Sequence, residues 1–168
     1  LWSAHPKAAM VHATGMYFSR TGQQLKDIWP KVRRIYDKFG IPTEWQLVDQ
    51  AEIIGYRAME HQLTPDSEYE LQAPTAMHWH PGVHAALAGD TILVMPGGCE
   101  IVTRSTVWPQ LRVQVKGHDV LCCGLLLIRD SEIPDVADAA GENKSDALFS
   151  GFGLPDDDPD GSRMDSIW

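Results

Sequence analysis

The sequence has little of what membrane, secreted or zinc-stabilised proteins require. Its 168 residues contain no apolar run near the ~18 residues that a membrane-spanning helix needs. No signal peptide is visible, because polar residues interrupt the first apolar stretch at residues 5–7. There are only three cysteines, and none has the Cys-x-x-Cys or Cys/His spacing of structural zinc: Cys99, Cys122 and Cys123. We predict reduced thiols in a cytoplasmic protein without membrane contact.

The body of the chain also lacks a surplus of basic side chains. Residues 1–129 contain 12 acidic and 12 basic side chains, whereas residues 130–168 contain 11 acidic and two basic ones and carry the whole net charge of −9. A body with balanced charge does not attract a phosphate backbone, which argues against nucleic acid as a partner. We predict one domain over residues 1–129. An acidic tail, residues 130–168, follows it and is either disordered or packed on a partner.

The hydrophobic period changes near residue 43. Residues 8–19 are mostly apolar, and we predict a strand there. Thr21 and Gln24 fit a capping box before a helix over residues 25–39, whose apolar residues recur every three or four positions, and Gly40 ends that helix. After residue 43 the period becomes two, which predicts strands at 44–49, 69–71, 76–80, 91–95, 100–104, 111–115 and 120–128. This order indicates an α+β fold.

Four segments resemble motifs of one superfamily. Residues 90–103 (DTILVMPGGCEIVT) resemble its last site strand and the following G-x-E-x-L-T turn, and residues 77–83 (MHWHPGV) resemble its T-V-E-P-G-I strand. Residues 48–60 (VDQAEIIGYRAME) resemble H-G-x-x-H-G-x-G-x-x-x-H-E, and residues 17–20 (YFSR) resemble D-x-[ST]-R before a long helix. These motifs are those of the pita-bread superfamily, which includes methionine aminopeptidase, aminopeptidase P and creatinase.

The resemblance implies a particular architecture. Residues 1–129 would form the C-terminal part of a pita-bread domain, with an antiparallel-rich sheet and a long helix. The other half would be supplied upstream in a longer precursor or by another chain, because half a domain leaves its sheet edge and core open to water. We therefore expect a homo- or hetero-oligomer.

The resemblance also implies that the family's metal ligands are replaced. In the metallopeptidases of this superfamily, two Asp, one His and two Glu hold a pair of divalent ions. Matched residue by residue, the two Asp positions fall at Pro6 and Tyr17, and the His position falls at Glu52. The two Glu positions fall at His80 and Gly89. Proline and glycine have no ligand side chain, so we predict no metal and no other cofactor.

The same match predicts an acid–base site. His78 and His80 lie on one face of their predicted strand, and the resemblance places Glu52 and Glu60 beside it. A neutral imidazole next to a carboxylate can accept or donate a proton near neutral pH. We therefore predict a metal-independent hydrolase that cleaves a C–N or similar bond of a small molecule, as creatinase does without a metal. The residues predicted to bind substrate are Tyr17, Tyr56, Trp79 and Arg104.

Two alternatives remain open. The spacing of His78, His80 and His84 could hold zinc, although histidines in strands are more often structural. The chain could also be a catalytically silent pseudo-enzyme subunit that completes or regulates a partner chain. The cluster of titratable side chains favours an enzyme, whereas the replaced ligands and the acidic tail favour the silent subunit.

Overall fold

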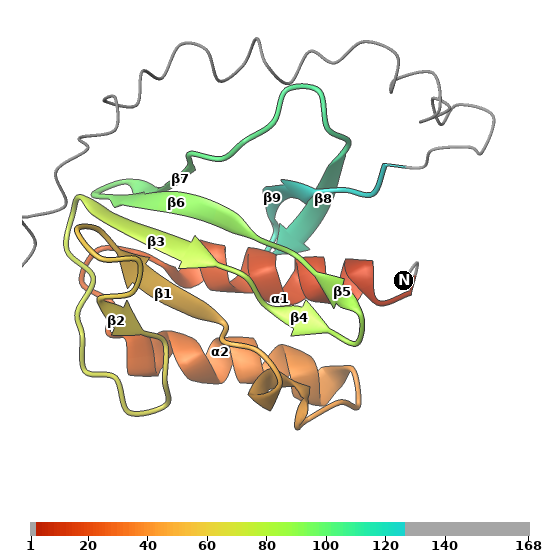
Figure 1. The fold of residues 1–168 in the computed structure, drawn as a ribbon, viewed down its shortest axis with the longest axis horizontal. Coiled ribbons are helices and arrows are strands. Elements are labelled where there is room, and N and C mark those ends of the chain that lie inside the picture. The colour runs from red at the N-terminus through yellow and green to blue at the C-terminus, as the bar shows by residue number, and fades with distance from the viewer. Residues whose placement is uncertain (1–2, 127–168) are drawn as a thin grey trace, which may run out of the picture. The chain divides into compact units, whose positions relative to one another are not determined.

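The structure, a computed structural model, describes residues 3–126, and the predicted acidic tail lies outside the described residues. It contains two helices, α1 (His5–Phe18) and α2 (Leu25–Lys38), and a short 3-10 helix, η1 (Glu44–Gln46). The helices lie together on one side of a twisted sheet (Figure 1). Neither of these helices is long and apolar enough to cross a membrane.

Five antiparallel strands form the main sheet, in the order β2–β1–β3–β6–β7. Their bounds are β1 (Ala51–Ile54), β2 (His61–Gln62), β3 (Thr75–Trp79), β6 (Asp90–Met95) and β7 (Gly98–Ile101). Two separate hairpins complete the described fold: β4 (Gly82–Val83) with β5 (Ala86–Leu87), and β8 (Gln110–Val115) with β9 (His118–Cys123). The predicted α+β class is therefore confirmed.

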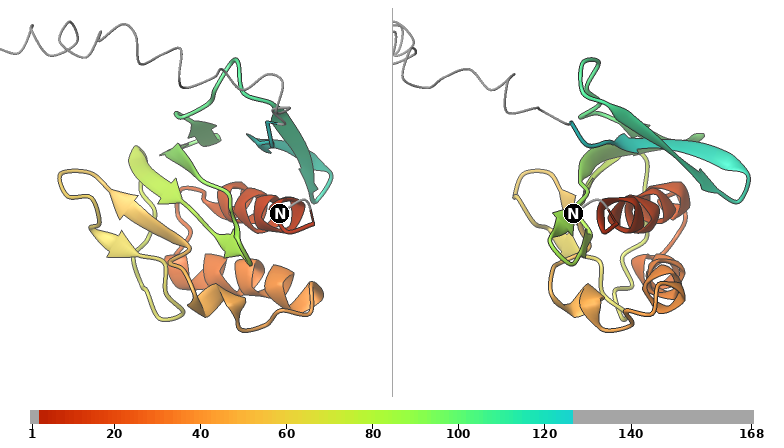
Figure 2. Two further views of the ribbon diagram at one scale, coloured as in Figure 1. Left: turned by 45° about the vertical axis from the view of Figure 1, so that its right-hand side comes forward. Right: turned by 90° about the vertical axis from the view of Figure 1, so that its right-hand side faces the viewer.

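Helix α1 replaces the strand predicted at residues 8–19, and that prediction is wrong. The helix has no single apolar stripe, because it contacts α2, the sheet and both hairpins and is buried on nearly all sides (Figure 2). A helix that is apolar all round is the expected form for such a central position. Gly15 lets α1 pack directly against the sheet, since a Cβ there would lie 2.3 Å from Cζ3 of Trp79.

Helix α2 has the predicted apolar stripe, which buries Ile28, Trp29 and Val32. Its N-terminus does not use the predicted capping box. The first backbone N–H groups of the helix instead donate to the carbonyl oxygens of Tyr69 and Ser67, each at 2.9 Å. Because residues 67–69 satisfy these donors, no side-chain cap is needed. The helix ends before Gly40, which has a φ of +71° as predicted for a C-terminal stop.

The sheet has one covered and one open face. Burial alternates along β3 and β6, so that Met77, Trp79, Ile92 and Val94 face the helices. The intervening side chains are only half-buried and lie on the opposite face. Among the described residues no helix covers that opposite face, which leaves its polar side chains accessible.

The remaining strand predictions divide clearly. The strands predicted at 76–80, 91–95 and 111–115 are confirmed within one residue, and β7 begins two residues earlier than predicted. Strand β9 ends at Cys123, so the prediction to residue 128 is too long. Residues 44–49 form η1 and a turn, while residues 69–71 contribute only an isolated bridge from Glu70 to Gln24. The strands β1, β2, β4 and β5 were not predicted.

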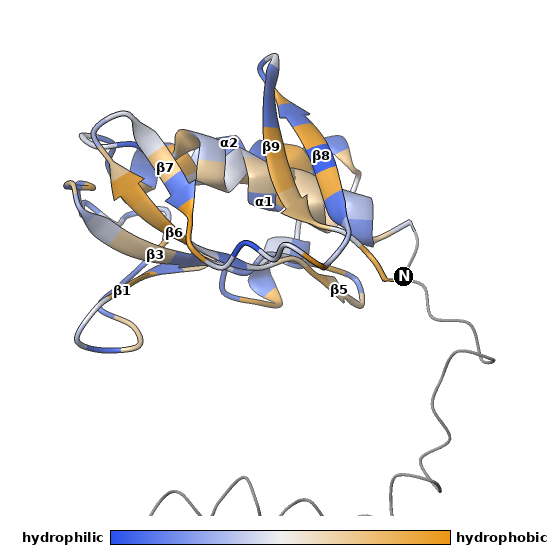
Figure 3. Cartoon of the chain, turned by 90° about the horizontal axis from the view of Figure 1, so that it is seen from above, coloured by the Kyte–Doolittle hydropathy of each residue, from blue (hydrophilic) through white to orange (hydrophobic). Residues whose placement is uncertain are grey.

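Strand β8 has the alternating pattern of a half-buried strand, visible as blue and orange bands in Figure 3, whereas β9 is apolar after its first two residues. The two-residue turn between them places Lys116 and Gly117 at φ values of 51° and 80°, the geometry of a type I′ turn. Val113 and Val115 face inward and join the core. The turn therefore joins the strands predicted on either side of it, at 111–115 and from residue 120.

Candidate functional site

Glu52, His78 and His80 converge on the open face of the sheet. The register of β1 and β3 places Glu52 opposite His78. The Oε2 atom of Glu52 lies 2.5 Å from Nε2 of His80, with 15% and 22% of these side chains exposed. The imidazole rings of His78 and His80 stack with centroids 5.0 Å apart. Three of the four predicted acid–base residues therefore form one cluster that water can reach.

Thr91 orients His78 within this cluster. Its hydroxyl oxygen lies 3.1 Å from Nδ1 of His78, directly across the β3–β6 ladder. When this hydroxyl donates to Nδ1, the proton of the neutral ring lies on Nε2, which can then donate a hydrogen bond to a substrate. Thr91 was not predicted as a site residue, although it is the first residue of the strand predicted at 91–95 and pairs with His78 in the sheet.

A buried hydrogen-bond network anchors the backbone at His80 and two residues after it. The backbone N–H of His80 donates to the carbonyl of Gln50 at 2.9 Å. The Gln50 side chain donates to the carbonyls of Val48 and Trp45, at 2.8 and 3.1 Å. The hydroxyl of Tyr36 lies 2.9 Å from the carbonyl of Gly82 and 2.8 Å from Oε1 of Gln50. Burial raises the pKa of Tyr36, so its hydroxyl remains a donor.

Two predicted site residues lie outside the cluster on exposed turns. Glu60 is exposed, and its carboxylate accepts from the backbone N–H of Arg57 at 3.2 Å and lies over Gly55. Its prediction as part of the acid–base set is therefore wrong, because the turn after β1 directs the Glu60 carboxylate toward the backbone of that same turn. Tyr56 is fully exposed on the same turn and contacts no member of the cluster.

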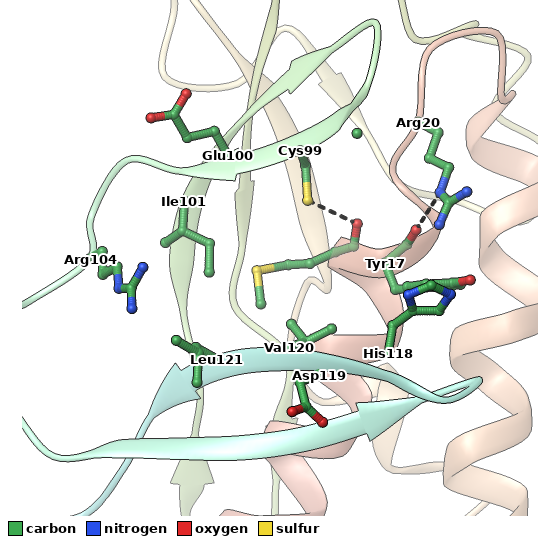
Figure 4. A pocket seen from close by; sticks show the side chains of 12 residues that line it. Tyr17, Arg20, Cys99, Glu100, Ile101, Arg104, His118, Asp119, Val120 and Leu121 are labelled. Carbon is green, nitrogen blue, oxygen red and sulfur yellow. Dashed lines mark hydrogen bonds between the residues drawn. The ribbon is translucent and has the colours of Figure 1, made fainter.

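The other predicted substrate-binding residues also lie elsewhere. Trp79 is 0% exposed, because strand alternation places it on the helix face, where its Nε1–H donates to Ser19. Its prediction as a substrate-binding residue is wrong. Tyr17 is at the C-terminal end of α1 and lines, together with Arg104, a separate cavity beside β7 (Figure 4). Neither residue belongs to the Glu52 cluster.

The position matched to the family's second site Glu is next to His80. A Cβ at Gly89 would lie 3.6 Å from Cβ of His80, so these two matched positions are neighbours in space. The positions matched to the two Asp are different, since Pro6 and Tyr17 lie in helix α1 and not on a strand. Residues 17–20 precede the long helix α2, as their match to D-x-[ST]-R implies, but they follow a helix and not a strand.

The donor set can be compared with what metal ions need. The ligand atoms of Glu52, His78 and His80 lie within 4.8 Å of one another, and one carboxylate with two imidazoles is a set that can hold a single ion such as zinc. A pair of ions needs carboxylates that reach both of them. Gly89 supplies none, and within residues 3–126 the group of ligand atoms close enough to share an ion is limited to Glu52, His78 and His80. The described residues therefore offer a ligand set for one ion.

A second titratable pair is buried under the sheet. His12 and Asp90 are 1% and 3% exposed, and Nε2 of His12 lies 3.8 Å from Oδ2 of Asp90. Burial, and then the charge of His78, lowers the pKa of His12 to about 3. Burial raises the pKa of Asp90, although the hydroxyl of Thr103 donates to it. This pair was not predicted, because residues 8–19 were expected to form a strand and not helix α1.

The three cysteines are free thiols, as predicted. Burial raises the pKa of Cys99 and Cys123, and it raises the pKa of Cys122 to about 12. A protonated thiol is a weak nucleophile, so these cysteines are unsuited to covalent catalysis at neutral pH.

Comparison with known proteins finds similarity in structure. No protein-family model matches the sequence, and no curated protein matches it. The prolidase from Pyrococcus horikoshii OT3 superposes with a TM-score of 0.57 and 15% identity, over 62% of this chain and 31% of that chain. The Xaa-Pro dipeptidase from Bacillus anthracis gives 0.56 and 19%, over 62% and 31%. The dipeptidase PepE from Mycobacterium ulcerans gives 0.52 and 19%, over 59% and 29%.

These likenesses establish the fold. The chain has the pita-bread fold that its motifs predicted, and it spans about a third of the length of the solved structures that it matches. At such identities the similarity concerns backbone arrangement alone, so the chemistry has to be argued from the cluster itself.

Proposed function

We propose that the protein is a hydrolase in which Glu52 and His80 act as a metal-independent acid–base pair on a C–N bond of a small molecule. The observation that carries this proposal is the 2.5 Å contact between Oε2 of Glu52 and Nε2 of His80 on an accessible sheet face. A carboxylate that faces an imidazole stabilises the imidazolium formed when the ring takes up a proton. The half-buried location of both groups strengthens this interaction relative to bulk water.

The chemistry divides into two proton transfers. In the first, neutral His80 removes a proton from water while the water oxygen attacks the carbon of the C–N bond. In the second, the imidazolium donates that proton to the leaving nitrogen, and the C–N bond breaks. Glu52 holds its charge beside the ring throughout, while His78, fixed by Thr91, can donate a hydrogen bond to the oxygen that becomes negative.

The metal-independent form of this proposal rests on the donor set. His80 and Gly89 stand at the positions matched to the family's two Glu, and they are neighbours. An imidazole is neutral when it ligates and cannot bridge two ions as a carboxylate does, and glycine provides no side-chain ligand. The residues that remain are suited to moving protons.

The first substrates to test follow from the structural neighbours, which include Xaa-Pro dipeptidases. With a panel of Xaa-Pro dipeptides, we expect His80→Gln and Glu52→Gln each to lower kcat/KM at least about 100-fold, because each removes one partner of the proton transfer. The measurement is product release followed by chromatography.

Two exposed residues provide matched controls. Glu68→Gln and His61→Gln remove the same chemical groups elsewhere on the surface and should leave kcat/KM unchanged. A similar fall in all four variants would contradict the assignment.

A second candidate is a catalytically silent subunit that completes or regulates a partner chain in a homo- or hetero-oligomer. It is favoured by the chain's match to about a third of the length of its structural neighbours. It is also favoured by apolar side chains exposed on the turn between β1 and β2, such as Tyr56 and Met59. If the protein hydrolyses no compound of the panel and its mass in sedimentation equilibrium depends on concentration, this candidate is supported over the hydrolase.

A further inference from the structure

A cavity of about 570 Å³ lies between the C-terminal end of α1, strand β7 and the β8–β9 hairpin (Figure 4). Its volume is within the range of sites for small organic ligands. Cys99 and Ile101 line it and pair with Val94 and Ile92 of β6, which face the helices. The cavity is therefore on the helix side of the sheet, away from the Glu52 cluster.

Two guanidinium groups border this cavity, those of Arg20 and Arg104. Neither takes part in an ion pair within residues 3–126. Figure 4 shows them on opposite sides of the cavity, with Arg20 after the end of α1 and Arg104 after the end of β7. Two unpaired cations that face the same space attract an anion from both ends.

The guanidinium group of Arg20 is already oriented. Its Nε–H donates to the carbonyl of Tyr17 at 3.0 Å, and its central carbon lies 4.5 Å from the centroid of the Tyr17 ring. The ring of His118 packs against the same tyrosine, with centroids 5.4 Å apart. The two terminal nitrogens of Arg20 make no hydrogen bond among the described residues and remain free for a carboxylate, which guanidinium binds through two parallel hydrogen bonds.

The acidic side chains at this cavity do not cancel its charge. The carboxylate of Asp119 is bound by Arg112 at 2.8 Å and by Gln114 at 3.2 Å. Glu100 points away from Cys99 and Ile101, on the other side of β7 (Figure 4). The space between the two arginines is instead lined by the apolar residues Met16, Ile101 and Val120.

We propose that this cavity binds an elongated organic dianion, with an acidic group at Arg20, a second acidic group at Arg104 and an apolar spacer over Met16, Ile101 and Val120. Charge at both ends and an apolar floor between them define this class of ligand. The binding site is independent of the proposed hydrolase function, because it uses none of the cluster residues and lies on the other face of the sheet.

The test compares three probes of equal chain length by isothermal titration calorimetry: suberate, octanoate and octane-1,8-diol. Suberate is expected to bind about tenfold more tightly than octanoate, because only the diacid reaches both arginines, and the diol should bind more weakly still. Equal affinities for suberate and the diol, or no heat of binding with any of the three, would overturn the proposal.

Variants then locate the two ends of the ligand. Arg20→Gln and Arg104→Gln should each weaken suberate binding about tenfold, and either variant should bind suberate and octanoate equally well. Arg33→Gln, an exposed residue of α2 outside the cavity, removes the same charge and should leave both affinities unchanged. An equal loss in all three variants would show attraction by net charge alone and would refute the site.

Each variant is first compared with the parent chain by circular dichroism. Arg20 and Arg104 are both exposed, so the substitutions are expected to preserve the fold. The hydrolase assay on the same variants separates the two proposals, because loss of suberate binding with unchanged hydrolysis is the result expected of a separate site.

Discussion

Replacing Gly15 by alanine is expected to lower the free energy of unfolding by about 3 kcal/mol. The new Cβ would lie 2.3 to 2.5 Å from three carbons of the Trp79 indole, far inside van der Waals contact. The ring has no room to move, because it is 0% exposed and its Nε1–H donates to Ser19 at 3.1 Å. Alanine's advantage over glycine in a helix, about 1 kcal/mol, is too small to offset this overlap.

Chemical denaturation of the variant and of two controls measures this effect. Gly97→Ala places a Cβ in open space and should change stability by less than about 0.5 kcal/mol. In the Trp79→Leu background, Gly15→Ala should cost less than it does alone, because the clashing ring is gone. If Gly15→Ala were neutral in the parent chain, α1 would not pack on β3 as described.

Lowering the pH is expected to destabilise the protein through His12. The unfolded pKa is 6.5 and the folded pKa is about 3, so between these values the unfolded chain binds one more proton at this residue. The free energy of unfolding therefore falls as the pH drops below about 6.5, by about 1.4 kcal/mol per pH unit and by ~5 kcal/mol in all. Asp90 acts in the opposite direction, since its raised pKa gives stability that is present at low pH and lost as the pH rises.

The variant His12→Leu isolates this effect. Both ring nitrogens of His12 are buried without a hydrogen-bond partner, so the substitution should raise stability by about 1–3 kcal/mol at pH 7. It should also remove most of the decrease in the free energy of unfolding between pH 6.5 and pH 3. His61→Gln, at an exposed site, should leave the pH profile of unfolding unchanged. If the free energy of unfolding of His12→Leu still fell steeply at acid pH, the fall would originate in other titratable groups.

Period and spacing were sufficient to predict the elements that present one face to the core. Helix α2 has a single apolar stripe, and strands β3 and β6 alternate, because each packs on one side only. Helix α1 is contacted on nearly all sides, so its apolar residues have no period that distinguishes a buried helix from a buried strand. Its alanines and lack of a β-branched run are the signal that favoured a helix.

The sequence predicted those parts of the candidate site that lie on paired strands or directly beside them. Glu52, His80 and Gly89 were placed correctly beside one another, because their motifs lie on paired or adjoining segments. Glu60 and Trp79 were misplaced, since a turn reverses the first and strand alternation buries the second. The pair His12 and Asp90 could not be found from the sequence, because it depends on how α1 packs against β6.

The most direct test of the acid–base pair is hydrolysis by protein that has been treated with a chelator and analysed for metals. We expect the treated protein to contain no stoichiometric metal and to retain its full rate on the dipeptide that the untreated protein cleaves best. Loss of activity on chelation, with recovery on adding zinc or manganese, would contradict the proposal that Glu52 and His80 act without a metal.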